Sequence, residues 1–259
     1  MRSSGVGGER VSAAFTEWMK ALEARHLADL QFAEVTRALR ALSSVYVERR
    51  GRLQAGAALA GAGKRAAFAL FYGPLHYLLL DALVGAIPGA ASIAGPLVDL
   101  GCGTGAAGAA WAAACPSSPV VVGIDRHPWA VKEAARTYRE LGLRGRAHVG
   151  DTTRDPLPRG RAYLAAFTLN ELSPPDRAVL IGRLLDLAAH GSAVLVVEPV
   201  SKRAVPWWSE VASTIVKAGG QASEWRFPIR LPPIVEKLDR AAGLNHQAVA
   251  ARTLWIRPA

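Results

Sequence analysis

Residues 97–108 read LVDLGCGTGAAG, an apolar stretch that runs into glycines at positions 101, 103, 105 and 108. We interpret its first four residues as a buried strand and the alanine-rich residues after Gly105 as a helix of small side chains. A glycine turn between strand and helix lets a ligand approach the backbone, because no Cβ stands in the way. The stretch therefore predicts a ligand bound where this strand ends.

From Pro96 onward, apolar strands alternate with helical patterns. Near-continuous apolar strands separated by helices predict a parallel sheet covered on both faces. We therefore expect an α/β fold with a doubly wound, seven-stranded, mostly parallel sheet in residues 96–259. The predicted strands cover 97–100, 120–125, 146–151, 163–169, 192–199, 224–230 and 251–257, and the predicted helices cover 105–114, 128–141, 173–190 and 233–242.

Residues 1–95 predict a helical N-terminal cap. Apolar side chains recur at helical spacing over 11–27 and 30–50, and again over 64–87, where Pro74 should kink or end the helix. The most apolar part, 66–80, is too short to span a bilayer, and the N-terminus has no secretory pattern. The two cysteines, Cys102 and Cys115, exclude a disulfide framework and a four-cysteine metal site. We expect a cytoplasmic protein with no membrane association.

The formal net charge is +10, and the excess of basic residues lies in the flanks. Residues 201–259 contain 9 Lys and Arg against 4 Asp and Glu, whereas residues 96–200 contain 11 against 10. Such flanks are suited to an anionic partner such as RNA. The alternative is that a GC-rich genome has favoured arginine on solvated faces.

Two registers of the glycine turn compete. GTGAAG at 103–108 matches the GxGxxG pattern of dinucleotide sites. However, the predicted strand ends at Leu100, so the first glycine after it is Gly101 and the register becomes GxGxG. Asp99 beside this turn would repel a pyrophosphate, whereas it can face a cationic amino group. A positively charged ligand is therefore favoured over a dinucleotide.

VDLGCGTG at 98–105 resembles the first motif of class I S-adenosylmethionine (SAM) dependent methyltransferases. The resemblance implies a Rossmann-like methyltransferase fold, SAM as cofactor, S-adenosylhomocysteine as product, and no metal. It places Asp99 near the methionine amino group, Asp125 at the ribose hydroxyls and Asp151 at the adenine. The implied cofactor-binding residues are Asp99, Gly101, Cys102, Gly103, Gly105, Asp125, Arg126, Asp151, Thr152 and Asn170.

Each of these acids has a structural alternative. Asp125 can cap the helix that follows it, and Asp151 can serve the turn of its GDTTRD loop. Cys102 is expected to be a small turn residue, because no base is evident beside it.

The acceptor is expected where FTLNELSPP at 167–175 leaves the fourth strand. Asn170 can hydrogen-bond an acceptor and Glu171 can take a proton, so both are predicted catalytic residues; alternatively, Glu171 caps the next helix. Glu198 follows the fifth strand and is a predicted substrate contact. The resemblance to the ribosomal-subunit family given in the next paragraph adds Tyr72, His76 and Tyr77 as substrate-binding residues, on a helix that covers the crevice; alternatively, His76 is a core residue of that helix.

Several stretches together resemble the small-ribosomal-subunit methyltransferase-like family, whose members include mitochondrial ribosome-associated proteins. They are ALSSVYVERRG (41–51), KRAAFALFYGPLHYLLLDAL (64–83), WAAA (111–114), TLNELS (168–173) and VLVVEP (194–199). This resemblance implies ribosomal RNA or a small-subunit component as acceptor. Mitochondrial members carry a cysteine cluster in the C-terminal half, but this chain has no cysteine after Cys115, which excludes an iron–sulfur or zinc site there.

Three functions stay open from the sequence. The first is methyl transfer to a ribosomal component, with a basic group at Arg49, Arg50, Arg52, Lys64 and Arg65 holding phosphates. The second is a small-molecule N- or O-methyltransferase with a closed pocket. The third is a ribosome-assembly factor that keeps the fold without catalysis. The sequence makes no prediction of the oligomeric state.

Overall fold

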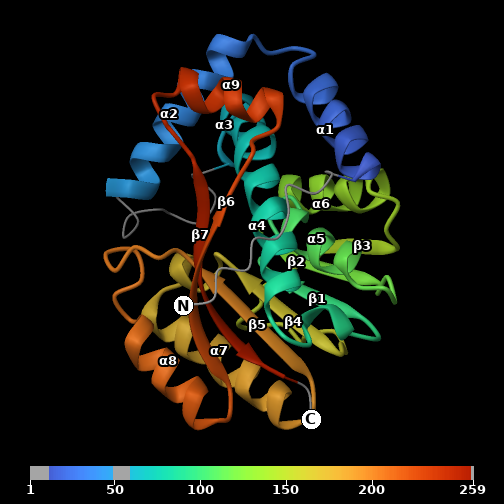
Figure 1. Ribbon diagram of the computed structural model, residues 1–259, viewed down its shortest axis with the longest axis vertical. Helices are drawn as coiled ribbons and strands as arrows, with labels where there is room; N and C mark the ends of the chain where they lie inside the picture. The colour runs from blue at the N-terminus through green and yellow to red at the C-terminus, as the bar shows by residue number, and fades with distance from the viewer. Residues whose placement is uncertain (1–11, 49–58, 258–259) are drawn as a thin grey trace.

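The computed structural model describes residues 12–48 and 59–257. Its seven strands form one sheet in the order β3-β2-β1-β4-β5-β7-β6 (Figure 1). The first five strands are parallel, and β7 runs antiparallel to both β5 and β6. The predicted fold class is therefore confirmed. The strands are β1 Leu97–Leu100, β2 Val121–Asp125, β3 Gly145–Val149, β4 Ala162–Ala166, β5 Ala193–Glu198, β6 Gln221–Pro228 and β7 Ala248–Ile256.

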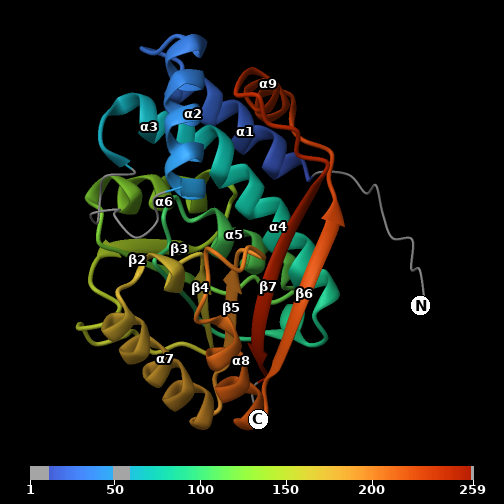
Figure 2. The same cartoon turned by 90° about the vertical axis from the view of Figure 1, so that its left-hand side faces the viewer.

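Helices cover both faces of the sheet. Successive strand residues alternate between the faces, so Leu97 belongs to the apolar cluster with α4 and α5, and Val98 to the cluster with α7 and α8. In Figures 1 and 2, α7 and α8 lie together, away from α4 and α5. The sequence analysis missed α8. The helices are α1 Ala13–His26, α2 Phe32–Glu48, α3 Ala62–Ala67, α4 Gly73–Ala86, α5 Ala106–Ala114, α6 Pro128–Glu140, α7 Pro174–Ala189, α8 Trp208–Lys217 and α9 Pro233–Ala241, and a π-helix, η3, covers Phe68–Tyr72.

The helix from Ala62 to Ala86 is continuous for 25 residues through α3, η3 and α4. It does not end at Pro74, because the backbone widens there: the N–H of Gly73 donates to the carbonyl of Phe68, five residues earlier, in a π-helical bond. Proline, which has no N–H, enters α4 at its second position, in the turn that follows this π-helical bond.

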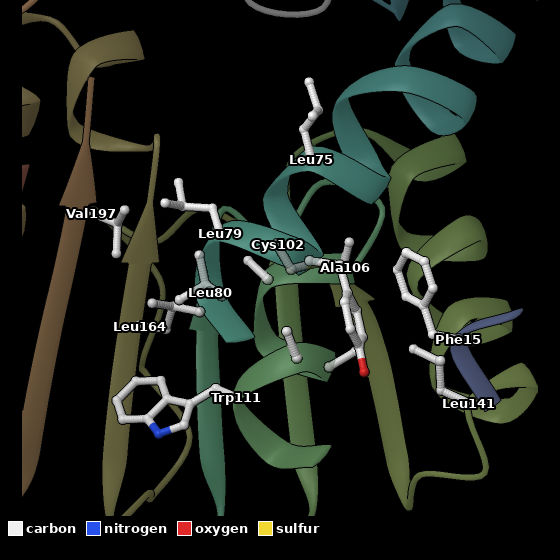
Figure 3. Packing of buried hydrophobic residues seen from close by; sticks show 14 of the residues in the cluster. Phe15, Leu75, Leu79, Leu80, Cys102, Ala106, Trp111, Leu141, Leu164 and Val197 are labelled. Carbon is white, nitrogen blue, oxygen red and sulfur yellow. The ribbon is translucent and has the colours of Figure 1, made fainter. Parts of the chain in front are cut away.

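By length and composition this helix is long and apolar enough to cross a membrane, so the expectation that the apolar region is too short was wrong. Its apolarity has another cause. In the most apolar 18-residue window of the helix, 67% of the window is buried inside the protein, as in a core helix. Figure 3 shows Leu79 and Leu80 of α4 in the buried cluster that also contains Leu164 of β4, Val197 of β5 and Trp111 of α5.

Helix α1 is held to the sheet domain by charge as well as by apolar contacts. Arg25 lies 2.6 Å from Glu133 and 2.7 Å from Glu140 of α6, and Nε2 of His26 lies 2.9 Å from Glu133. Burial alone would raise the pKa of Glu133, but the hydrogen bonds and charges of His26 and Arg25 lower it to about 2. Buried side chains from before and after residue 95 belong to one hydrophobic cluster. The predicted domain boundary between residues 95 and 96 stays a prediction.

Candidate active site

The glycine turn after β1 has a backbone that only glycine adopts easily. Gly101 and Gly105 have φ values of +71° and +76°. A Cβ on Gly101 would lie 2.6 Å from Oγ1 of Thr168, and one on Gly105 would lie 2.9 Å from Cα of Ala134. The turn is thus fixed by its packing at the carboxyl end of β1, where Gly101 and Gly103 are half-buried.

Asp99 lies within β1 and points toward α5. It is 1% exposed, and its Oδ2 accepts a hydrogen bond of 3.1 Å from the N–H of Gly108. Its Oδ1 is buried and accepts no hydrogen bond from the part of the chain that the structure describes. Burial, with a smaller contribution from the charge of Asp125, raises the pKa of Asp99 to about 7. A buried carboxyl group with an unpaired oxygen fits a cationic ligand such as SAM.

Asp125 ends β2 and joins it to the glycine turn. Its Oδ2 accepts from the N–H of Gly103 at 2.9 Å, and its Oδ1 accepts from the N–H of His127 at 2.8 Å. The N-cap of α6 is His127, whose ring accepts from the N–H of Trp129, so Asp125 is not the helix cap. Burial raises the pKa of Asp125. The carboxylate lies at the carboxyl end of β2 beside the glycine turn, and its contact with the ribose stays a prediction.

Asp151 follows β3 and is engaged within its own loop. Its Oδ1 accepts from Nη2 of Arg126 at 2.9 Å, from the N–H of Thr153 at 2.9 Å and from Oγ1 of Thr153 at 2.6 Å. Burial alone would raise the pKa of Asp151, but these hydrogen bonds and the Arg126 charge together lower it. The turn role of Asp151 is therefore observed, whereas its contact with adenine stays a prediction. Thr152 and Cys102 are buried beside these turns.

The segment after β4 forms the acceptor side. Asn170 lies in the short 3₁₀ helix Leu169–Glu171 (η5), and its Oδ1 is buried without a hydrogen bond from the described residues. Its backbone N–H donates to Oε1 of Glu198 at 3.3 Å. Glu198 is 0% exposed and supports this turn, and its predicted contact with the substrate stays a prediction. Glu171 is exposed.

The predicted substrate contacts on the covering helix divide into two groups. Tyr77 is wrongly assigned: it is buried against α1, with ring centroids 4.7 Å from Phe15 and 5.6 Å from Trp18. It follows His76 by one residue, which turns it about 100° around the helix. Tyr72 and His76 are half-buried on the other side.

Two aromatic residues of the site were missed. The ring of Phe68 lies over the glycine turn, 3.6 Å from a Cβ built on Gly103. The ring of Phe167, at the end of β4, stacks on His76 with a centroid distance of 4.4 Å. The spacing of Phe68, Tyr72 and His76 at every fourth residue was the available signal for Phe68. We call these three residues the aromatic stripe.

Comparisons with known proteins agree with this site. Residues 97–191 match a family described as a methyltransferase domain. No curated protein matches the chain. Among the described residues, no group of three or more His, Cys, Asp or Glu side chains is placed to hold a metal.

Solved structures of methyltransferases share the fold at low sequence identity. Human N-acetylserotonin methyltransferase in complex with SAM has a TM-score of 0.54 at 16% identity, over 93% of this chain and 70% of that one. The O-methyltransferase NcsB1 from neocarzinostatin biosynthesis has a TM-score of 0.52 at 19% identity, over 95% of this chain and 74% of that one. Mitomycin 7-O-methyltransferase MmcR has a TM-score of 0.52 at 17% identity, over 93% of this chain and 72% of that one. The likeness therefore extends into the N-terminal helices.

The family match covers the residues that carry the glycine turn, Asp99 and Asp125, and it contains strands β1 to β4 of the seven-stranded sheet. Residues 97–191 therefore form a class I SAM-dependent methyltransferase domain.

Proposed function

We propose that this methyltransferase acts on a nitrogen or oxygen of a small molecule. The observation that carries the proposal is the aromatic stripe, which lies across the glycine turn and reaches the end of β4 through Phe167. Half-buried aromatic side chains around a few polar groups are typical of small-molecule sites. Asn170, with its buried and unpaired Oδ1, supplies such a polar group.

A ribosomal acceptor has less support. Arg25 and Arg126 are paired with carboxylates, and Nε of Arg65 donates to the carbonyl of Leu59. Paired cations of this kind do not form a track for phosphates. Arg49, Arg50 and Arg52 of the predicted RNA-binding group lie outside the described residues.

The names of the matched structures favour the same proposal. Mitomycin and N-acetylserotonin are small molecules, and the NcsB1 structure holds 2-hydroxy-5-methyl naphthoic acid together with SAM. None of these three names mentions RNA or a ribosome. At 16–19% identity they indicate a class of acceptor for this chain, and no particular compound.

In the proposed reaction, a lone pair of the acceptor forms a bond to the methyl carbon while the carbon–sulfur bond breaks and its electrons go to sulfur. SAM supplies an activated methyl group, so the protein's main contribution is orientation. Asn170 would orient the acceptor, and Glu171, which is exposed at the same turn, would pass the released proton to water.

Incubation of the protein with methyl-labelled SAM tests the proposal. One reaction contains a metabolite extract below about 1 kDa, and the other contains ribosomal subunits with their RNA. We expect label in the small-molecule fraction, and none with Asp125→Ala. Label in ribosomal RNA or protein alone would refute the proposal and restore the ribosomal reading. Binding of SAM without label in either fraction would favour the non-catalytic alternative.

A further inference from the structure

The helix Ala62–Ala86 presents different side chains to the core and to the site. Leu70, Phe71 and Leu75 are buried in the core, whereas the aromatic stripe is half-buried. The rings of the stripe are close together: the centroids of Phe68 and Tyr72 are 5.8 Å apart, and those of Tyr72 and His76 are 6.3 Å apart. This side of the helix therefore carries a continuous row of half-buried aromatic side chains, of which Tyr72 also packs against the core.

Phe167 continues the aromatic surface onto the sheet. Its φ of +57° is unusual for a residue with a side chain, and its N–H donates to the carbonyl of Val197 at 2.7 Å. With this backbone conformation, its ring lies nearly parallel to that of His76, at an interplanar angle of 20°. Strained backbone held by surrounding contacts is common at ligand sites.

His76 is the polar member of this surface. Its ring nitrogens make no hydrogen bond with any residue in the described ranges 12–48 and 59–257, and its ring neighbours are Phe68, Tyr72 and Phe167. Burial lowers the pKa of His76 to about 4, so the ring is neutral near pH 7. A neutral imidazole has one N–H donor and one acceptor nitrogen, and both gain from a partner in apolar surroundings.

We propose that the acceptor is a flat aromatic compound that lies against the aromatic stripe and Phe167, with a hydroxyl group hydrogen-bonded to His76. The inference rests on the proposed function and adds the class of acceptor. Flat rings fit because aromatic side chains pack well against them. An uncharged hydroxyl group fits because it both donates and accepts, as the neutral imidazole does. His76 thus positions and selects the acceptor, and it does not carry the proton away.

The test uses the full chain loaded with S-adenosylhomocysteine and two probes, 2-naphthol and naphthalene, which differ by the hydroxyl group. Their dissociation constants are measured by NMR titration for the wild type, His76→Phe and His76→Gln. His76→Phe keeps an aromatic ring opposite Phe167 but cannot make the hydrogen bond, whereas His76→Gln keeps hydrogen-bonding groups. His190→Phe on α7 is the matched control, since that histidine is exposed on the other face of the sheet.

We expect His76→Phe to weaken 2-naphthol binding about three- to tenfold, the range of one hydrogen bond, and to leave naphthalene binding unchanged. His76→Gln should recover part of the loss, and His190→Phe should change neither probe. Equal losses for both probes, or no binding of 2-naphthol to the wild type, would overturn the inference. If the metabolite extract is still labelled in that case, the proposed function stands and only the aromatic class fails.

Discussion

The buried carboxyl group of Asp99 should make the stability of the fold depend on pH. Its pKa is raised from 3.8 to about 7, so the folded protein holds a proton that the unfolded chain releases. The free energy of unfolding should therefore fall as the pH rises from about 4 to about 7. Three pKa units at about 1.4 kcal/mol each amount to about 4 kcal/mol. Asp99→Asn keeps an oxygen for the N–H of Gly108 but does not ionise.

We thus expect Asp99→Asn to match the wild type near pH 4 and to be more stable by about 4 kcal/mol at pH 8. Urea unfolding without SAM, followed by tryptophan fluorescence between pH 4.5 and 8, measures both proteins. Subtracting the variant's free energy of unfolding from that of the wild type at each pH removes the contribution of other titrating groups such as Glu133. Asp29→Asn, at an exposed carboxylate, is the control and should show no such trend. A wild-type-to-variant difference that stays constant from pH 5 to 8 would refute the reasoning.

Three further substitutions test the turn, the cofactor contact and the link to α1. Gly105→Ala should lower the free energy of unfolding, measured with urea, by about 2 kcal/mol or more, because φ is +76° and the added Cβ meets Ala134. Gly182→Ala is the control: nothing lies within 4 Å of the added Cβ, so the change should be neutral or stabilising. Asp125→Ala should weaken SAM binding at least tenfold by calorimetry, and an unchanged affinity would remove Asp125 from the cofactor site. Glu133→Gln should lower the free energy of unfolding by about 3 kcal/mol, because it leaves Arg25 without its buried partner. The wild type should lose the same contribution as the pH falls from about 4.5 toward 2, where Glu133 becomes protonated. Glu17→Gln, at an exposed pair, should change little in the same assay, and equal losses for both variants would contradict the buried role of Glu133.

The parts of the site that depend on local sequence were predictable. The glycine turn and Asp125 follow from a strand, a bend and the end of the next parallel strand, and the structure places them together. The sheet was predictable for the same reason, because its inner strands are mostly apolar. Helix α8 was missed because only Trp208, Val211 and Ile215 are buried along its length, a short pattern next to a proline-containing loop.

The rest of the site depends on contacts between distant segments. Which side of the covering helix faces the site depends on the elements packed against it, and Tyr77 was misplaced because its ring packs against Phe15 and Trp18 of α1. The backbone of Phe167 is set by its contact with Val197 of the neighbouring strand. The pairing of Asp151 with Arg126 needs the loops after β2 and β3 to meet. Nothing in the local sequence reports any of these contacts.

The position of β7 has a consequence for how the protein matures on the ribosome. This strand follows β6 in the chain, yet it lies between β5 and β6 and is the one strand with which β6 pairs within the described residues. While the chain is being synthesised, the five parallel strands can assemble, but β6 emerges with no neighbour to pair with. Strand β6 can join the sheet only after β7 has been synthesised and has paired with β5, so the antiparallel edge of the sheet forms after its parallel part.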